Sequence, residues 1–110
     1  MAIKRMYVVV LRKLSAGLKA AQACHAMTAF TFAYPQQTRD WFVNSNNLVV
    51  LQCDDLPDLA DELERQGLVV ARFHEPDRDG ELTAICTEPG ARKVLGRVAL
   101  ADSDQGTVPG

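Results

Sequence analysis

Three polar side chains follow one another at three-residue intervals in a stretch that is otherwise small and apolar. They are Lys19, Gln22 and His25, within the sequence GLKAAQACHA at residues 17–26. In a helix of 3.6 residues per turn, each lies about 60° around the axis from the one before and roughly 4.5 Å further along. The spacing therefore predicts a short polar row on a helix whose small neighbours allow close packing.

A second group of polar residues lies in FHEPDRDGELT, residues 73–83, between two apolar runs. Functional groups are often carried by loops at the ends of strands. In an α/β unit the helix N-terminus and the strand ends can share one crevice. We therefore expect Glu75, Asp77 and Thr83 to lie near the polar row, on the basis of topology alone.

These residue types can do hydrolytic chemistry. A carboxylate can take a proton from water, a glutamine or lysine can stabilise an oxyanion, and a hydroxyl can orient the nucleophile. Together they predict ester or amide hydrolysis without a metal. Each also has a plainer explanation, because a single helical histidine such as His25 is often a packing residue and Glu75-Pro76-Asp77 is typical of a turn. The residue types alone leave both interpretations open.

Patterns for other chemistries are absent from the sequence. The two histidines have no i, i+4 partner of the kind a zinc site uses. No serine lies in a G-x-S-x-G elbow, and there is no Walker or Rossmann glycine pattern. Cys24 and His25 are adjacent, but neighbouring helix residues point about 100° apart and do not form a thiol–base pair. We predict no metal and no cofactor.

Length and composition indicate one ordinary soluble domain. The chain has 110 residues, of which 47% are hydrophobic and 24% charged, enough for a single core. No apolar run approaches the roughly 18 residues of a membrane span, so we expect no membrane partner. The start of the chain has charge on both sides of its apolar run and no cleavage site, which argues against a signal peptide.

The three cysteines are odd in number and widely separated. Cys24, Cys53 and Cys86 include no C-x-x-C pair, which argues against a disulfide framework or a zinc site and favours the reducing cytoplasm. We expect all three to be small buried hydrophobic residues.

Charge is distributed unevenly although the net charge is only −2. With Arg39 set aside, the chain before Asp40 has no acid and five cations: Lys4, Arg5, Arg12, Lys13 and Lys19. Acids concentrate in residues 54–79. A basic N-terminal half can meet a phosphate backbone, and a solvated charged face is the alternative.

The order of the predicted elements indicates an α/β fold. Apolar, β-branched runs predict strands at residues 6–12, 48–53, 68–73 and 82–87, and a last apolar run, RVAL, follows. Helical patterns predict helices at 16–33 and 35–43, one after Asp54 or Asp55, and at most a short one at 91–96. This order predicts a four-stranded mixed sheet with helices packed on both faces.

Local signals predict how the helices begin and end. Ser15 is expected to cap the first helix, which is apolar on nearly every side and should be largely buried. The third helix has an aspartate cap at its start and Gly67 at its end. We take residues 1–100 as one domain and expect 101–110 to be a disordered tail, because that segment has little apolar surface.

Several of these features occur together in one known family. The first strand ends in arginine as YVVVLR, the helix carries AAQACHA, and Trp41 lies in the second helix. LVVL, GLVV and LTAICTEP then fit the remaining strands. From Tyr7 to Leu100 the chain resembles the type II peptidyl-tRNA hydrolases, in a divergent form like those of bacteria and phages. The element A-A-Q-x-x-H-A carries most of this resemblance.

The resemblance implies an activity and partners. Such enzymes hydrolyse the ester between a peptide and the 3′ end of its tRNA, recycling tRNA in translation, and need no cofactor. The implied partner is peptidyl-tRNA, whose acceptor-stem phosphates would meet cations. We assign tRNA binding to Arg12, Lys13 and Lys19. Family members often pair, so the resemblance also leads us to consider a homodimer.

The resemblance also implies roles for the polar residues. Gln22, with Lys19, would bind or polarise the ester carbonyl. Glu75 or Asp77 would position or deprotonate water, aided by Thr83. His25 would support Gln22 and Glu75 through hydrogen bonds rather than act as a base.

Some positions differ from the family pattern. The family lysine falls at Leu18 here, with Lys19 next to it, and Glu75 replaces the aspartate of the family's loop. Two alternatives to an enzyme therefore stay open: a non-catalytic module that binds tRNA or a protein, and a structural or oligomer-forming domain.

Overall fold

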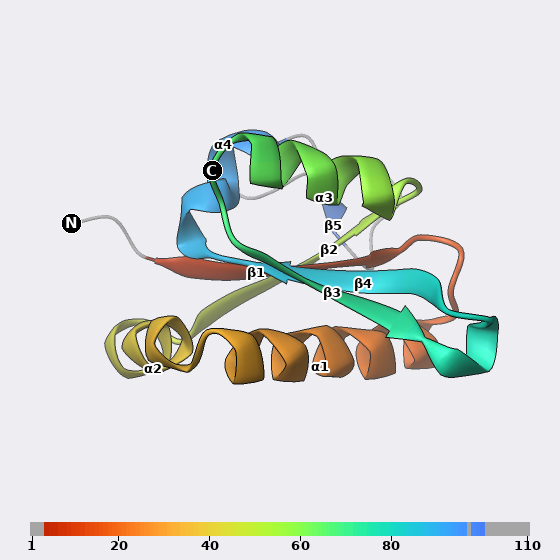
Figure 1. Ribbon diagram of the computed structural model, residues 1–110, viewed down its shortest axis with the longest axis horizontal. Helices are drawn as coiled ribbons and strands as arrows, with labels where there is room; N and C mark the ends of the chain where they lie inside the picture. The colour runs from red at the N-terminus through yellow and green to blue at the C-terminus, as the bar shows by residue number, and fades with distance from the viewer. Residues whose placement is uncertain (1–3, 97, 101–110) are drawn as a thin grey trace.

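The computed structural model describes residues 4–96 and 98–100. Its strands form one sheet in the order β3-β4-β1-β2-β5 (Figure 1). The strands are β1 (Arg5–Leu11), β2 (Asn47–Cys53), β3 (Val70–Glu75), β4 (Glu81–Thr87) and β5 (Ala99–Leu100). The helices are α1 (Ala16–Ala33), α2 (Pro35–Asn44), α3 (Leu56–Arg65) and α4 (Arg92–Leu95), with short 3-10 turns at Pro76–Arg78 and Pro89–Ala91.

The sheet is mixed, as the order of elements predicts. β1 pairs with β2 in parallel and with β4 antiparallel, and β4 pairs antiparallel with β3. The four-stranded mixed sheet is confirmed, and the final apolar run adds the two-residue β5 beside β2.

Helices cover both faces of the sheet, which is also confirmed. Figure 1 shows α1 and α2 below the sheet and α3 and α4 above it. β1 is buried on both sides: Val8 packs in the apolar cluster between the sheet and α1, and Val9 packs in the cluster between the sheet and α3. A continuous apolar strand is what such a doubly covered position requires.

The pairing pattern brings the end of β1, the start of β4 and the end of β3 to the same end of the sheet. Because β4 runs antiparallel to β1, Ala84 near the start of β4 lies opposite Val10 near the end of β1. β3 ends at the same edge, where Glu75 lies opposite Glu81. The polar segment after β3 therefore lies near the beginning of α1, as Figure 1 shows on the right.

The first helix is less buried than the sequence pattern predicts. Ser15 caps α1 as expected, its Oγ accepting a hydrogen bond from the backbone N–H of Leu18 at 3.4 Å. Of the residues of α1, only Gln22, Ala26 and Phe30 are buried. The prediction of a largely buried helix is wrong, because α1 packs on the sheet along one face and most of its other residues are exposed or line a groove.

The third helix follows its local signals closely. Asp55 is the cap, with its carboxylate accepting from the backbone N–H of Asp58 at 3.0 Å. Leu56, Ala60 and Leu63 form its buried stripe. Gly67 ends the helix with a φ of 82°, a conformation that glycine adopts without strain.

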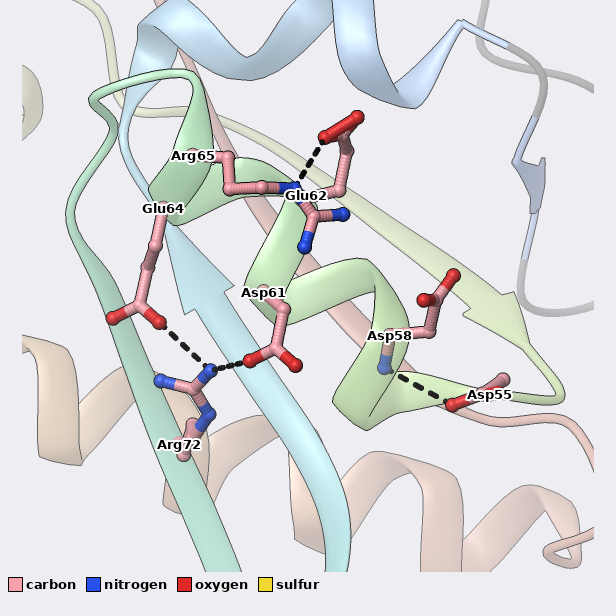
Figure 2. A network of polar contacts seen from close by, with 7 residues as sticks. All are labelled: Asp55, Asp58, Asp61, Glu62, Glu64, Arg65 and Arg72. Carbon is pink, nitrogen blue, oxygen red and sulfur yellow. Dashed lines mark hydrogen bonds and ion pairs between the residues drawn. The ribbon is translucent and has the colours of Figure 1, made fainter.

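An arginine on β3 ties this strand to α3. The guanidinium of Arg72 donates to Asp61 at 2.9 Å and to Glu64 at 2.8 Å, as Figure 2 shows. The hydrogen bond from Arg72 lowers the pKa of Glu64. These two ion pairs connect β3 to α3 at the surface of the molecule.

The cysteines differ from their predicted burial. All three thiols are free, but only Cys86 is fully buried, while Cys53 is partly buried and Cys24 is exposed. Burial raises the pKa of Cys86 to about 12 and that of Cys53 to about 11. The expectation is wrong for Cys24 because it lies on the open side of α1.

Two further expectations concern the ends and the environment of the chain. The predicted disordered tail, 101–110, lies outside the described residues. In the described part of the chain, no helix combines the length and apolarity required to cross a bilayer.

Candidate active site

Gln22 joins three elements through its side-chain amide. Its Nε2 donates to Glu75 Oε1 at 2.9 Å, and its Oε1 accepts from Thr83 Oγ1 at 2.5 Å. Gln22 is only 3% exposed and Thr83 is fully buried. The structure thus brings together three of the predicted site residues, from α1, the end of β3 and the start of β4.

A β-bulge brings Thr83 to the helix. Phe73 pairs with Ala84 and His74 with Leu82, so Thr83 is an extra residue in β4. Leu82 packs on the α3 side and Ala84 on the α1 side, and strict alternation would have turned Thr83 away from α1. Bulges re-aim side chains in this way and are common beside active sites.

Glu75 is held as an ionised carboxylate. The hydrogen bond from Gln22 lowers its pKa, as do the backbone N–H of Asp77 and the nearby charges of His25 and Arg78, against an opposing effect of burial. The Asp77 N–H lies 3.4 Å from Glu75 Oε2. The group is therefore ionised at neutral pH, and an ionised carboxylate can act as a general base when a water molecule attacks a substrate.

Asp77 contributes through its backbone. It lies in the 3-10 turn Pro76–Arg78, and its side chain is exposed. The turn that the local sequence Glu75-Pro76-Asp77 favours is therefore present. It positions the Glu75 carboxylate, which accepts the first free N–H of the turn.

His25 stacks on an aromatic ring. Its imidazole lies parallel to the ring of Phe73, with centroids 4.7 Å apart and an angle of 25° between the planes. Its nearby charge contributes to the lowered pKa of Glu75. Among the described residues, the aromatic ring that His25 contacts is that of Phe73 on β3.

Lys19 faces a different strand from Gln22. Its Nζ donates to Gln52 Oε1 at 2.6 Å, and Gln52 is a buried residue of β2. The polar row therefore divides across the sheet, because its 60° steps turn Lys19 toward β2 and His25 toward β3. Gln52 was missed by the sequence analysis, although a polar residue in the apolar run LVVLQC was a usable signal.

The other predicted tRNA-binding cations lie just after β1, at the same edge of the sheet. Arg12 Nε is 3.3 Å from Asp54, and Lys13 Nζ is 2.5 Å from Glu81. Glu81 also accepts from Arg78 at 2.8 Å. The hydrogen bonds from Lys13 and then Arg78 lower the pKa of Glu81. We call Arg12, Lys13 and Lys19 the cationic rim; Lys13 contacts Glu81, the residue that lies opposite Glu75 in the sheet.

Comparison with known families agrees with this geometry. A family model described as peptidyl-tRNA hydrolase PTH2 matches residues 4–100. The chain belongs to the PTH2 peptidyl-tRNA hydrolase family. A comparison with curated proteins finds no match.

Membership of the PTH2 family confirms the resemblance seen in AAQACHA and the surrounding strands. The match covers every element that carries a site residue, from β1 to β4. Within the described residues of this PTH2 chain, no group of three or more His, Cys, Asp or Glu side chains forms a metal site. The cluster of Gln22, Glu75 and Thr83 offers an amide, a carboxylate and a hydroxyl group.

Proposed function

We propose that this PTH2-family protein hydrolyses the ester bond of peptidyl-tRNA, or of N-acyl-aminoacyl-tRNA, and releases the peptide and free tRNA. The observation that carries the proposal is the hydrogen-bonded cluster of Gln22, Glu75 and Thr83. It supplies an ionised carboxylate and an oriented amide at the end of the sheet where the cations of the rim lie. Family membership supports the same reaction.

Glu75 is the general base in this mechanism. It takes a proton from a water molecule, whose oxygen attacks the ester carbonyl carbon. The tetrahedral intermediate then loses the ribose oxygen of tRNA, which receives the proton back from Glu75. The hydrogen bond from Gln22, with smaller contributions from the Asp77 N–H and the charges of His25 and Arg78, lowers the pKa of Glu75, so the carboxylate is deprotonated before the first step.

Gln22 stabilises the oxyanion. A glutamine amide has two N–H donors, and the bond to Glu75 uses one of them. Thr83 donates to the amide oxygen, which fixes the direction of both N–H groups. The second N–H is then available to a developing oxyanion, an interaction that typically contributes about 10²–10³ in rate.

The cationic rim binds the tRNA. Arg12, Lys13 and Lys19 are proposed to contact phosphates of the acceptor end. The ion pairs of Arg12 and Lys13 are at the surface, with cation side chains 38% and 60% exposed. Exposed pairs contribute only about 0–1 kcal/mol, so a phosphate can replace the carboxylate partner.

One observation favours a second candidate function. The position of the family lysine is occupied by Leu18, which is 44% exposed, and Lys19 is bonded to Gln52. The second candidate is therefore a module of the same fold that binds tRNA or a protein without cleaving the ester.

A single-turnover assay separates the two functions. Purified protein is mixed with N-acetyl-aminoacyl-tRNA, and release of the N-acetyl amino acid is followed, with unblocked aminoacyl-tRNA as control. We expect selective cleavage of the blocked substrate. A folded protein that binds this tRNA without cleaving it would reject the hydrolase and establish the binding module.

The family also suggests the cellular setting. We propose that the protein recycles tRNA during translation in the cytoplasm, and that it is a divergent member of bacterial or phage type. We also propose a homodimer, because Phe32, Phe42 and Val43 are 82%, 62% and 70% exposed. Light scattering during size-exclusion chromatography would measure the mass, and a monomer at micromolar concentration would reject the dimer.

A further inference from the structure

A groove runs between α1 and β2, on the opposite side of β1 from β3 and its Glu75. It encloses about 930 Å³. We call it the α1–β2 groove; its lining residues include Ala20, Ala23, Met27, Leu48 and Val50. It exists because α1 packs across β1, β3 and β4 while its small side chains leave the neighbouring face of β2 uncovered.

The groove has an apolar length and a cationic end. Leu48 lies at the start of β2 and is 46% exposed, whereas Gln52 lies near the end of the strand. Arg12 and Lys19 line the groove at this second end. Among the described residues that line it, none is acidic. Its charge therefore suits a ligand with an apolar body and an anionic or strongly polar head.

The cationic end of the groove is close to the proposed reaction centre. Lys19 precedes Gln22 by three residues in α1, so their Cβ atoms are about 5–6 Å apart. Gln22 in turn contacts Glu75. A substrate whose ester lies at the N-terminal part of α1 can therefore extend its acyl part along the helix into the groove.

The lining favours an aliphatic occupant over a nucleobase. Proteins bind unpaired bases by stacking them on aromatic rings or guanidinium planes. No aromatic side chain is among the described residues of the lining, and the guanidinium of Arg12 lies at its cationic end, paired with Asp54. Away from that end the lining consists mainly of alanine, valine, leucine and methionine side chains together with Thr28 and Thr31. The volume is within the roughly 300–1,000 Å³ of ligand pockets, which is room for a short peptide segment.

We propose that the α1–β2 groove binds the apolar C-terminal side chains of the peptide being released. It would then give the protein a preference for esters of apolar amino acids. The inference rests on the proposed hydrolase function and adds the specificity of that site. The charge pattern agrees, because the cations lie at the end of the groove where the ester and the tRNA phosphates would be.

The test compares two amino acids on one tRNA. N-acetyl-leucyl and N-acetyl-asparaginyl esters of the same tRNA are hydrolysed by the protein, and kcat/KM is corrected for spontaneous hydrolysis. The two side chains are similar in size and differ in polarity. We expect leucine to be preferred at least about tenfold, the lower end of what an apolar pocket discriminates per methylene.

A matched pair of helix variants locates the effect. Ala20 and Ala21 are both exposed residues of α1, but only Ala20 lines the groove. Ala20→Trp should fill the groove and reduce the preference for leucine to near one. Ala21→Trp should leave the preference unchanged. Circular dichroism melting would confirm that both variants are folded.

The outcomes separate this inference from the proposed function. Cleavage of both esters at similar rates would overturn the groove proposal and keep the hydrolase. Cleavage of neither would reject the hydrolase, and the specificity proposal with it. An equal loss of preference in Ala20→Trp and Ala21→Trp would also overturn the groove as its cause.

A binding measurement gives a readout without turnover. N-acetyl-L-leucine is titrated into the isotope-labelled protein, with N-acetylglycine as the control. We expect saturable NMR shifts at Ala23, Met27 and Val50, and their loss in Ala20→Trp. Absence of shifts at these residues with N-acetyl-L-leucine would overturn the proposal.

Discussion

Thr83 and Gln22 are 61 residues apart in the chain, and their side chains form a buried hydrogen bond of 2.5 Å. The bond gives the Gln22 amide a fixed orientation, with Nε2 turned to Glu75 and Oε1 turned to β4. It depends on the β-bulge opposite the step between Phe73 and His74. The orientation of the Gln22 amide, in the N-terminal half of α1, therefore depends on an irregularity in the sheet.

Thr83→Val should remove this bond while keeping the shape of the side chain. Because the buried Gln22 oxygen loses its donor, we expect about 1–3 kcal/mol less stability and a lower hydrolysis rate. Thr83→Ser should restore both. Urea unfolding and the single-turnover assay measure the two effects.

Thr87 provides the matched control for this variant. It is also a buried threonine of β4, and its hydroxyl donates to the backbone oxygen of Val69 at 2.8 Å, away from the site. Thr87→Val should lose stability without losing hydrolysis beyond the change in folded fraction. Equal rates for Thr83→Val and the unchanged protein would contradict the role given to Thr83.

Glu75→Gln should reduce hydrolysis by about 10²–10⁴, the usual contribution of a general base. Glu64→Gln is the control, since Glu64 is also a glutamate with a lowered pKa but lies on α3, bonded to Arg72 (Figure 2). Its rate should stay within about twofold of the parent. If Glu75→Gln kept the parental single-turnover rate, another group would have to be the base.

The pH dependence should report the hydrogen bond to Glu75. The pKa of Glu75 is lowered from its ordinary value of 4.5, with Gln22 as the largest cause. A base must be deprotonated to act, so the rate should fall only as the pH drops below 4.5. Gln22→Ala should move this acid limb to higher pH, whatever it does to the maximal rate.

The same shift has a consequence for stability. Because the pKa of Glu75 is lower in the folded state, its carboxylate stabilises the fold above the unfolded pKa, and this contribution is lost as the pH falls through the folded pKa.

Gln36→Ala, on the exposed face of α2, is the control for the prediction on the pH dependence of the rate, and it should not move the acid limb. An unmoved limb in Gln22→Ala would separate Glu75 from the titration that controls the rate.

Lys13→Ala should weaken tRNA binding and make it less dependent on salt. Each phosphate contact that is lost reduces the slope of log affinity against log salt by about one. Lys4→Ala is the control, because Lys4 is also an exposed lysine in a surface ion pair, with Asp40, but lies at the other end of β1. Identical slopes for the two variants would show that Lys13 does not contact phosphate.

Local sequence determined the elements of this protein and the residue types of its site. The β-branched run of β1 predicts a strand covered on both faces, and Ser15 and Asp55 predict the starts of α1 and α3. These signals are local, because a cap bonds within its own first turn and a strand's burial shows in consecutive residues. The motif AAQACHA likewise identifies the family without reference to the fold.

Tertiary structure decided which of those residues meet. The three-residue spacing places Lys19, Gln22 and His25 on one helix, but the strands beneath α1 direct them to β2, β4 and β3 respectively. Alternation along β4 would have turned Thr83 to the wrong face, and the bulge against β3 reverses this. The sequence pattern also overestimated the burial of α1, because the arrangement of the strands determines how much of the helix surface the sheet covers. Contacts between residues far apart in the chain depend on strand order and register, and neither is contained in a local pattern.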